Sequence, residues 1–199
     1  MTAPRVLFVE SGDSFSFNVL EALPIARCEA AIVGAEEALA QLDRSTPAWA
    51  VLGPGPFDPR AAGLLPVVAA LAERRIPTLG ICLGHQAIGV HFGARLAAAV
   101  PHHGVRDDVR FERSRLLPHF FGHARVMRYH SLALTEPIPE GLRVIARSGD
   151  GTVMALEHEE LPMLGLQFHP DSFATASGEA MIRDFVRAAL HEVTEEARP

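Results

Sequence analysis

Residues 76–88 read Ile-Pro-Thr-Leu-Gly-Ile-Cys-Leu-Gly-His-Gln-Ala-Ile and run from a hydrophobic strand into the start of a helix. Cys82 stands at the join, with Gly80 and Gly84 on either side. This is the cysteine form of the G-x-S-x-G elbow, in which a sharp turn forces the central side chain outward and glycines let neighbouring backbones approach closely. The helix N-terminus also favours a thiolate. The stretch predicts a nucleophilic cysteine, although a small hydrophobic residue in a buried turn would show the same pattern.

Upstream of this elbow, short hydrophobic runs alternate with helical stretches, which is typical of a parallel sheet built from right-handed crossovers. The predicted strands are Val6–Glu10, Glu29–Val33, Ala50–Leu52 and Thr78–Ile81. The predicted helices between them are Phe15–Leu23, Glu36–Leu42 and Ala61–Arg74. Ligands of open α/β sheets bind beyond the carboxyl ends of the strands. Cys82 is expected at this edge.

The second half of the chain has a different pattern. Residues 94–166 hold short alternating segments that predict added antiparallel strands, among them Val109–Phe111, Leu142–Ile145 and Val153–Leu156. A last helix at residues 178–191 carries apolar side chains at helical spacing and should pack on the sheet. We expect the charged tail, residues 192–199, to fray. Residues 1–199 are therefore predicted to form a single domain.

The amino-acid composition of the chain restricts the partners and the cellular location that we expect. The 199 residues include 24 acidic and 18 basic side chains and no cluster of Lys and Arg, which argues against nucleic acid as a partner. The apolar run near the N-terminus is too short for a signal peptide or a membrane span. We therefore expect a cytoplasmic protein whose two cysteines are free thiols, with Cys28 filling the core.

A thiolate nucleophile needs a nearby base, and His169 is the best placed of the 10 histidines. Residues 165–171 read Gly-Leu-Gln-Phe-His-Pro-Asp, a buried strand that ends in a histidine which Pro170 lifts out of the ladder. Asp171 can accept the other imidazole N–H, so Cys82, His169 and Asp171 form a candidate triad. By itself, the turn is also typical of a surface histidine beside a capping aspartate.

Attack on a carboxamide also needs donors for the developing oxyanion. The elbow offers the backbone N–H of Leu83. A strand runs directly into Gly53-Pro-Gly-Pro56, a rigid turn that can aim the Gly55 N–H at the same point. A tight turn without a catalytic role would have the same sequence.

Four motifs in order resemble class I glutamine amidotransferases, and most of all the small subunits of anthranilate synthase and aminodeoxychorismate synthase. The motifs are Gly53–Pro56, Gly80–Ile88, Arg128–Leu132 and Gln167–Ser172. The resemblance extends from Gly12–Phe15 to the last helix. It implies a flavodoxin-like fold, which is an open, mostly parallel sheet flanked by helices, with added antiparallel strands.

The resemblance also implies site residues and a function. The family's triad maps onto Cys82, His169 and Asp171, and its glutamine-binding positions match Gly53, Pro54, Gly55, Leu83, Gln86, Ser131 and Leu132. Such a chain hydrolyses L-glutamine without a metal or organic cofactor. It delivers the ammonia to a separate chorismate-aminating synthase subunit, of the anthranilate or aminodeoxychorismate type, in a heterodimer or heterotetramer.

Three features depart from the family pattern. Asp171 stands where the family usually has Glu, and His102–Val105 replaces a Met-His-Gly-Lys-like segment of the small chorismate-enzyme subunits. Residues 11–15 read Ser-Gly-Asp-Ser-Phe rather than Asn-Tyr-Asp-Ser-Phe. We expect a loop at residues 101–110 to face the synthase. These departures keep open a secondary-metabolite variant, a stand-alone hydrolase of γ-glutamyl compounds and a catalytically silent regulatory subunit with the same fold.

Overall fold

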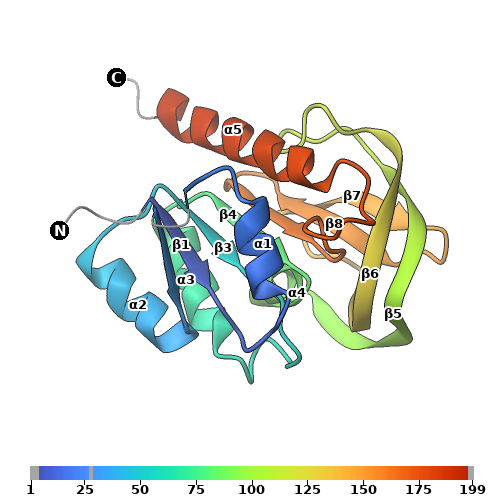
Figure 1. The fold of residues 1–199 in the computed structure, drawn as a ribbon, viewed down its shortest axis with the longest axis horizontal. Coiled ribbons are helices and arrows are strands. Elements are labelled where there is room, and N and C mark those ends of the chain that lie inside the picture. Colours follow the sequence, from blue (N-terminus) through green and yellow to red (C-terminus); the bar gives the residue numbers. More distant parts are fainter. Residues whose placement is uncertain (1–4, 27–28, 197–199) are drawn as a thin grey trace.

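The described residues form one nine-stranded sheet in the order β2-β1-β3-β4-β9-β8-β7-β5-β6 (Figure 1). The computed structural model of this chain describes residues 5–26 and 29–196. Cys28, predicted to fill the core, lies outside the described residues. The parallel half of the sheet comes mainly from the first part of the chain, and the antiparallel half comes from the second part.

The parallel half contains four hydrophobic tetrapeptides and one strand from late in the chain. These strands are β1 (Val6–Val9), β2 (Ala30–Val33), β3 (Trp49–Leu52), β4 (Thr78–Ile81) and β9 (Met163–Leu166). Strands covered by helices on both faces read as continuous apolar runs, which is why the sequence signal was strong here. The four predicted strands are confirmed to within one residue at each end.

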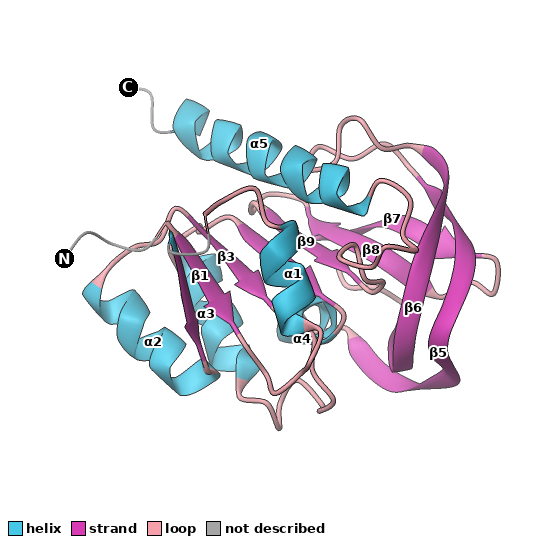
Figure 2. Ribbon diagram, viewed as in Figure 1, coloured by secondary structure: helices cyan, strands magenta, loops and turns pink. Residues whose placement is uncertain are grey.

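Helices cover both faces of this half (Figure 2). Val6 and Phe8 share a core with α1 (Ser16–Ala22) and α5 (Gly178–Glu196). Leu7 and Val9 point the other way and pack with α2, α3 and α4, whose bounds are Ala35–Arg44, Leu64–Glu73 and Leu83–His91. This alternation follows from the two-residue period of a strand. Within the described residues, no helix is both long enough and apolar enough to cross a membrane.

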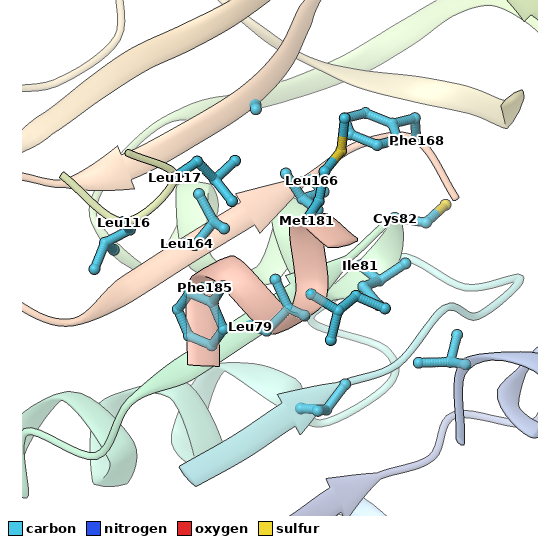
Figure 3. Packing of buried hydrophobic residues seen from close by; sticks show 14 of the residues in the cluster. Leu79, Ile81, Cys82, Leu116, Leu117, Leu164, Leu166, Phe168, Met181 and Phe185 are labelled. Atoms are coloured by element: carbon cyan, nitrogen blue, oxygen red, sulfur yellow. The ribbon is translucent and has the colours of Figure 1, made fainter. Parts of the chain in front are cut away.

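Helix α5 supports the strands that carry the site. Figure 3 shows Met181 and Phe185 of α5 packed with Leu79 and Ile81 of β4, and with the neighbouring residues of β9. Cys82 lies at the edge of the same cluster. The helix continues to Glu196, beyond the predicted end near residue 191, so most of the predicted tail is helical; residues 197–199 lie outside the described residues.

The antiparallel half confirms the prediction of added strands but corrects its details. It consists of β5 (Arg95–Phe111), β6 (Gly122–Thr135), β7 (Leu142–Ser148) and β8 (Val153–His158). The predicted loop at residues 101–110 is wrong, because these residues lie within the 17-residue strand β5. Pro101 and Gly104 suggest a turn, but β5 accommodates them through register shifts between Ala98 and His102 and between His103 and Val105.

Candidate active site

Cys82 lies at the turn between β4 and α4, with backbone angles φ 52° and ψ −99°. A Cβ on Gly80 would come within 2.5 Å of the Gly84 carbonyl group, and a Cβ on Gly84 within 2.2 Å of the Leu52 oxygen. Only glycine fits at either position. The Cys82 N–H donates to the Leu166 oxygen at 2.8 Å, which ties the turn to β9. The side chain is thereby held at the carboxyl edge of the sheet.

His169 and Asp171 follow β9, and the side chains of both are buried. The backbone N–H of His169 donates to the backbone oxygen of Met127 on β6 at 3.0 Å, which fixes the backbone of this turn. The imidazole Nδ1 lies 3.3 Å from Asp171 Oδ1. The two groups are not aligned for a hydrogen bond, and neither Asp171 oxygen has a partner among the described residues. The carboxylate nevertheless lies against the ring and raises the pKa of His169.

The charge of His169 is set by its neighbours. Burial lowers the pKa of the imidazole, but Asp171 and the Cys82 sulfur together outweigh burial and raise this pKa to about 10. An imidazole with this pKa is protonated at neutral pH. The structure thus places a cationic histidine beside the sulfur of the elbow.

Two aromatic rings pack against this histidine. The ring centroids of Phe15 and Tyr129 each lie 5.2 Å from that of His169, in edge-on arrangements. Phe15 and Tyr129 are 4.9 Å apart, so the three rings form one cluster. Both residues lie in segments that resemble the family, but no sequence pattern predicted that their rings meet. The rings limit the rotation of the imidazole.

The predicted oxyanion-hole residues lie beside each other. A Cβ on Gly55 would come within 2.4 Å of Leu83 Cδ2 and 2.9 Å of Ser11 Cβ, so the turn after β3 touches the first residue of α4. Gly53 is held by a hydrogen bond from its N–H to the Val9 oxygen at 2.9 Å. The Leu83 N–H lies in the first turn of a helix, where no acceptor exists within the helix.

The predicted glutamine-binding residues come from α4 and β6. Gln86 Nε2 donates to the Leu132 oxygen at 3.0 Å, so these two elements are joined beside the elbow. Ser131 is exposed and Leu132 half-buried on β6. Gln86 is itself buried, and its amide also donates to Gln167 Oε1 at 3.1 Å. Pro54 is buried next to Gly53.

The structure adds one polar residue to the site. Gln167 Nε2 lies 3.7 Å from Cys82 Sγ, and the Tyr129 oxygen lies 4.0 Å from the same sulfur. Gln167 belongs to the fourth motif, but its place in a strand does not reveal which distant side chain it meets. In the described part of the chain, no group of three His, Cys, Asp or Glu side chains is placed to hold a metal ion.

Comparisons with known proteins show the family to which this chain belongs. The family model of class-I glutamine amidotransferases matches residues 7–189. Anthranilate synthase component 2 of Azospirillum brasilense is 37% identical over 189 residues, spanning 91% of this chain and 94% of that protein. Aminodeoxychorismate synthase of Streptomyces griseus is 38% identical over 193 residues, spanning 91% of this chain but 25% of that protein.

A solved structure supports the fold. A glutamine amidotransferase of Thermotoga maritima superposes with a TM-score of 0.68, at 16% identity and over 100% of this chain and 87% of that chain. At this identity, the likeness concerns the fold alone. The residues that the family model matches include the elbow, the turn after β9 and the strands that position them. The chain belongs to the class-I glutamine amidotransferase family.

Proposed function

We propose that this glutamine amidotransferase is the glutaminase subunit of a chorismate-aminating synthase, with Cys82, His169 and Asp171 as its triad. The observation that carries the proposal is the buried pairing of the elbow cysteine with a histidine whose pKa is raised to about 10. A cationic histidine beside a strained elbow cysteine suits nucleophilic catalysis on an uncharged amide. A purely structural cysteine needs neither feature.

The reaction begins with attack of the Cys82 thiolate on the side-chain amide carbon of glutamine. The carbonyl oxygen becomes an oxyanion, for which the backbone N–H groups of Leu83 and Gly55 are the proposed donors. Protonated His169 then gives its proton to the leaving amine, and ammonia departs as the γ-glutamyl thioester forms. Water attacks the thioester with His169 as base, which releases glutamate and restores the thiolate–imidazolium pair.

Substrate contacts are proposed on the two sides of the elbow. Gly53, Pro54 and Gly55 line one side, and Gln86 with the backbone of Ser131 and Leu132 lines the other. Phe15 and Tyr129 close the region behind the histidine. These elements leave the thiol facing the edge of the sheet where ligands of open α/β folds bind.

The partner is proposed from the relatives and from the chemistry. Relatives named anthranilate synthase component 2 and aminodeoxychorismate synthase align over about nine-tenths of this chain. Ammonia released into water would be protonated and diluted, so hydrolysis is useful when a synthase takes up the ammonia directly. A chorismate-using subunit that docks over the site is the partner that these facts support.

The division of labour can be tested with Cys82→Ser in the complex with a chorismate-using synthase subunit. Product formation from glutamine should fall by at least about 100-fold, because a neutral serine hydroxyl is a much weaker nucleophile than a cysteine thiolate. Product formation from ammonium salts should stay within about twofold of wild type, because ammonia bypasses the thioester. Loss of both activities would contradict the proposal.

A further inference from the structure

A continuous set of hydrogen bonds leads from the nucleophile to a buried arginine on β6. Gln167 Nε2 lies 3.7 Å from Cys82 Sγ, and Gln86 Nε2 lies 3.1 Å from Gln167 Oε1. Gln86 Nε2 also lies 3.0 Å from the Leu132 oxygen. His130 Nδ1 lies 3.0 Å from that oxygen, and Arg128 Nε lies 3.1 Å from His130 Nε2.

Two groups fix the direction of each hydrogen bond, because the Arg128 guanidinium can only donate and the Leu132 carbonyl can only accept. His130 Nε2 must therefore accept from Arg128, and its Nδ1–H must donate to the Leu132 carbonyl. The Gln86 side chain must likewise present its NH₂ group to that carbonyl. The second hydrogen of this NH₂ group then donates to Gln167 Oε1, which leaves the Gln167 NH₂ group facing the sulfur.

The arginine end of the set is well anchored. The Arg128 side chain is 1% exposed and pairs through Nη1 with Asp107 and, at 3.1 Å, with Asp150. Its Nη2 donates to Thr152 Oγ1 at 3.3 Å. Burial and the Arg128 charge lower the pKa of His130 to about 4, so its Nε2 lone pair is available at neutral pH. The donor and acceptor roles along the hydrogen bonds from Arg128 to Gln167 are therefore fixed at neutral pH.

We propose that Gln167 is a further catalytic residue, whose side-chain amide donates to the Cys82 thiolate while the hydrogen bonds from Arg128 to Gln86 hold it in the donor orientation. The inference rests on the proposed function for its role in turnover. Gln167 is fully buried and Gln86 is 3% exposed, and amides are buried only where their hydrogen bonds are satisfied. A donor to sulfur favours the charged nucleophile over the neutral thiol.

The test measures the rate of Cys82 alkylation by iodoacetamide against pH in the full chain, without glutamine or partner. Mass spectrometry of the Cys82 peptide separates this signal from Cys28. Gln167→Met keeps the size and removes the donor, so the midpoint should rise by about one pH unit, the lower end for a hydrogen bond to a charged group. Gln167→Glu should raise it further, because a carboxylate would face the thiolate.

The matched control is Gln41→Met on α2, which makes the same chemical change at a half-buried site and should leave the midpoint unchanged. If Gln167→Met does not fold, Gln86→Met serves instead, because it frees the Gln167 amide to rotate and should also raise the midpoint. His169, with Asp171 next to it, is the titratable side chain placed beside the sulfur, and the Tyr129 ring packs against His169; every variant retains all three residues. Unchanged midpoints in the folded Gln167 variants would overturn the inference.

This experiment is independent of the proposed partner. If the alkylation midpoint rises in the Gln167 variants but the wild-type chain shows no glutaminase activity in the complex, the proposed function is contradicted and the Gln167 inference is kept. If the wild-type chain is an active glutaminase in the complex but the midpoint does not change in the Gln167 variants, the proposed function is kept and the Gln167 inference is contradicted.

Discussion

Cys82 adopts a conformation that its two neighbouring glycines make possible. Its φ of 52° lies in the left-handed region, where a residue other than glycine costs on the order of 1–3 kcal/mol. The fold tolerates this strain because Gly80 and Gly84 let α4 approach β3 and β4 closely. The same approach brings the sulfur to the helix N-terminus, so the strain and the reactivity have one structural cause.

We therefore expect Gly80→Ala and Gly84→Ala to destabilise the protein strongly. The added methyl group would lie 2.5 Å or 2.2 Å from backbone atoms that cannot move freely, so each variant should lose about 3 kcal/mol or more. Gly149→Ala is the control, since its Cβ would meet nothing within 4 Å, and it should stay within about 0.5 kcal/mol. Urea unfolding measures all three, and equal midpoints would show that α4 can shift.

The charge of His169 should depend on the sulfur. Cys82→Ala removes one of the groups that raise the pKa of His169, so this pKa should fall from about 10. Because the folded-state pKa lies above the unfolded value of about 6.5, the charged ring stabilises the fold fully below that value, and its contribution disappears as pH rises toward about 10. NMR titration of the His169 ring in both proteins checks this, and an unchanged pKa would remove the sulfur from the pair.

Asp171 should tolerate one more methylene group. Its oxygens make no hydrogen bond to described residues although Oδ1 lies 3.3 Å from His169 Nδ1, so Asp171→Glu can reach the ring. We expect kcat/KM for glutamine in the complex to stay within about threefold of wild type or to rise. Asp171→Asn, which loses the charge, should reduce it at least about tenfold. A large drop with Glu would mean that the shorter acid matches this site.

At the scale of single residues, the sequence motifs and the family resemblance were sufficient to name the three triad candidates. The structure brings Cys82, His169 and Asp171 together as predicted. It also shows the Gln167 side chain and the Tyr129 carbonyl beside the sulfur, and the motifs that contain these residues did not indicate either contact. Such contacts join residues far apart in the chain and depend on strand order, which no local periodicity encodes.

Among the elements, the parallel strands were predictable because helices cover both of their faces. The strand β5 was not, because Pro101 and Gly104 interrupt its alternation and its regular pairing resumes only after two register shifts. A bulged strand and a loop look alike in sequence, since both combine turn residues with broken periodicity. In the structure, residues 101–110 belong to β5, which pairs with β6 as a long antiparallel ribbon.

The position of β5 keeps its charged residues as candidates for contact with the synthase. Arg106 is exposed and lines a surface cavity together with Arg125 and Phe173, next to the turn that follows His169. Phe173 is 98% exposed, which is unusual for a large hydrophobic side chain. This combination of apolar and charged side chains beside the site is typical of a recognition surface.

We expect Arg106→Glu to weaken binding of the synthase subunit by about tenfold in Kd, as reversal of a charge at an interface rim does. Asp108, exposed on the same strand and paired with His123 at 2.7 Å, should respond to reversal in the same way. The control is Arg183→Glu, an exposed position on α5 that should leave Kd unchanged. Titration calorimetry with the synthase subunit gives the values, and equal affinities would place β5 outside the interface.

For the whole molecule, the site exists only because the two halves of the sheet meet at β4 and β9. The parallel half supplies Cys82 and the turn at Gly55, while the turn after β9 supplies His169. Strand β6 of the antiparallel half brings Tyr129 and Leu132 to the same place. Local patterns predicted strands in each half, but they did not predict that β9, a strand late in the chain, pairs in parallel with β4.

The most direct test is the rate of ammonia release from glutamine by the purified chain, alone and with a chorismate-using synthase subunit plus chorismate. The proposed function predicts slow release by the chain alone, a rise of at least about tenfold with the partner, and no release by Cys82→Ser in either condition. Full release without a partner would contradict a subunit role and indicate a stand-alone hydrolase. Release that persists in Cys82→Ser would contradict the nucleophile itself.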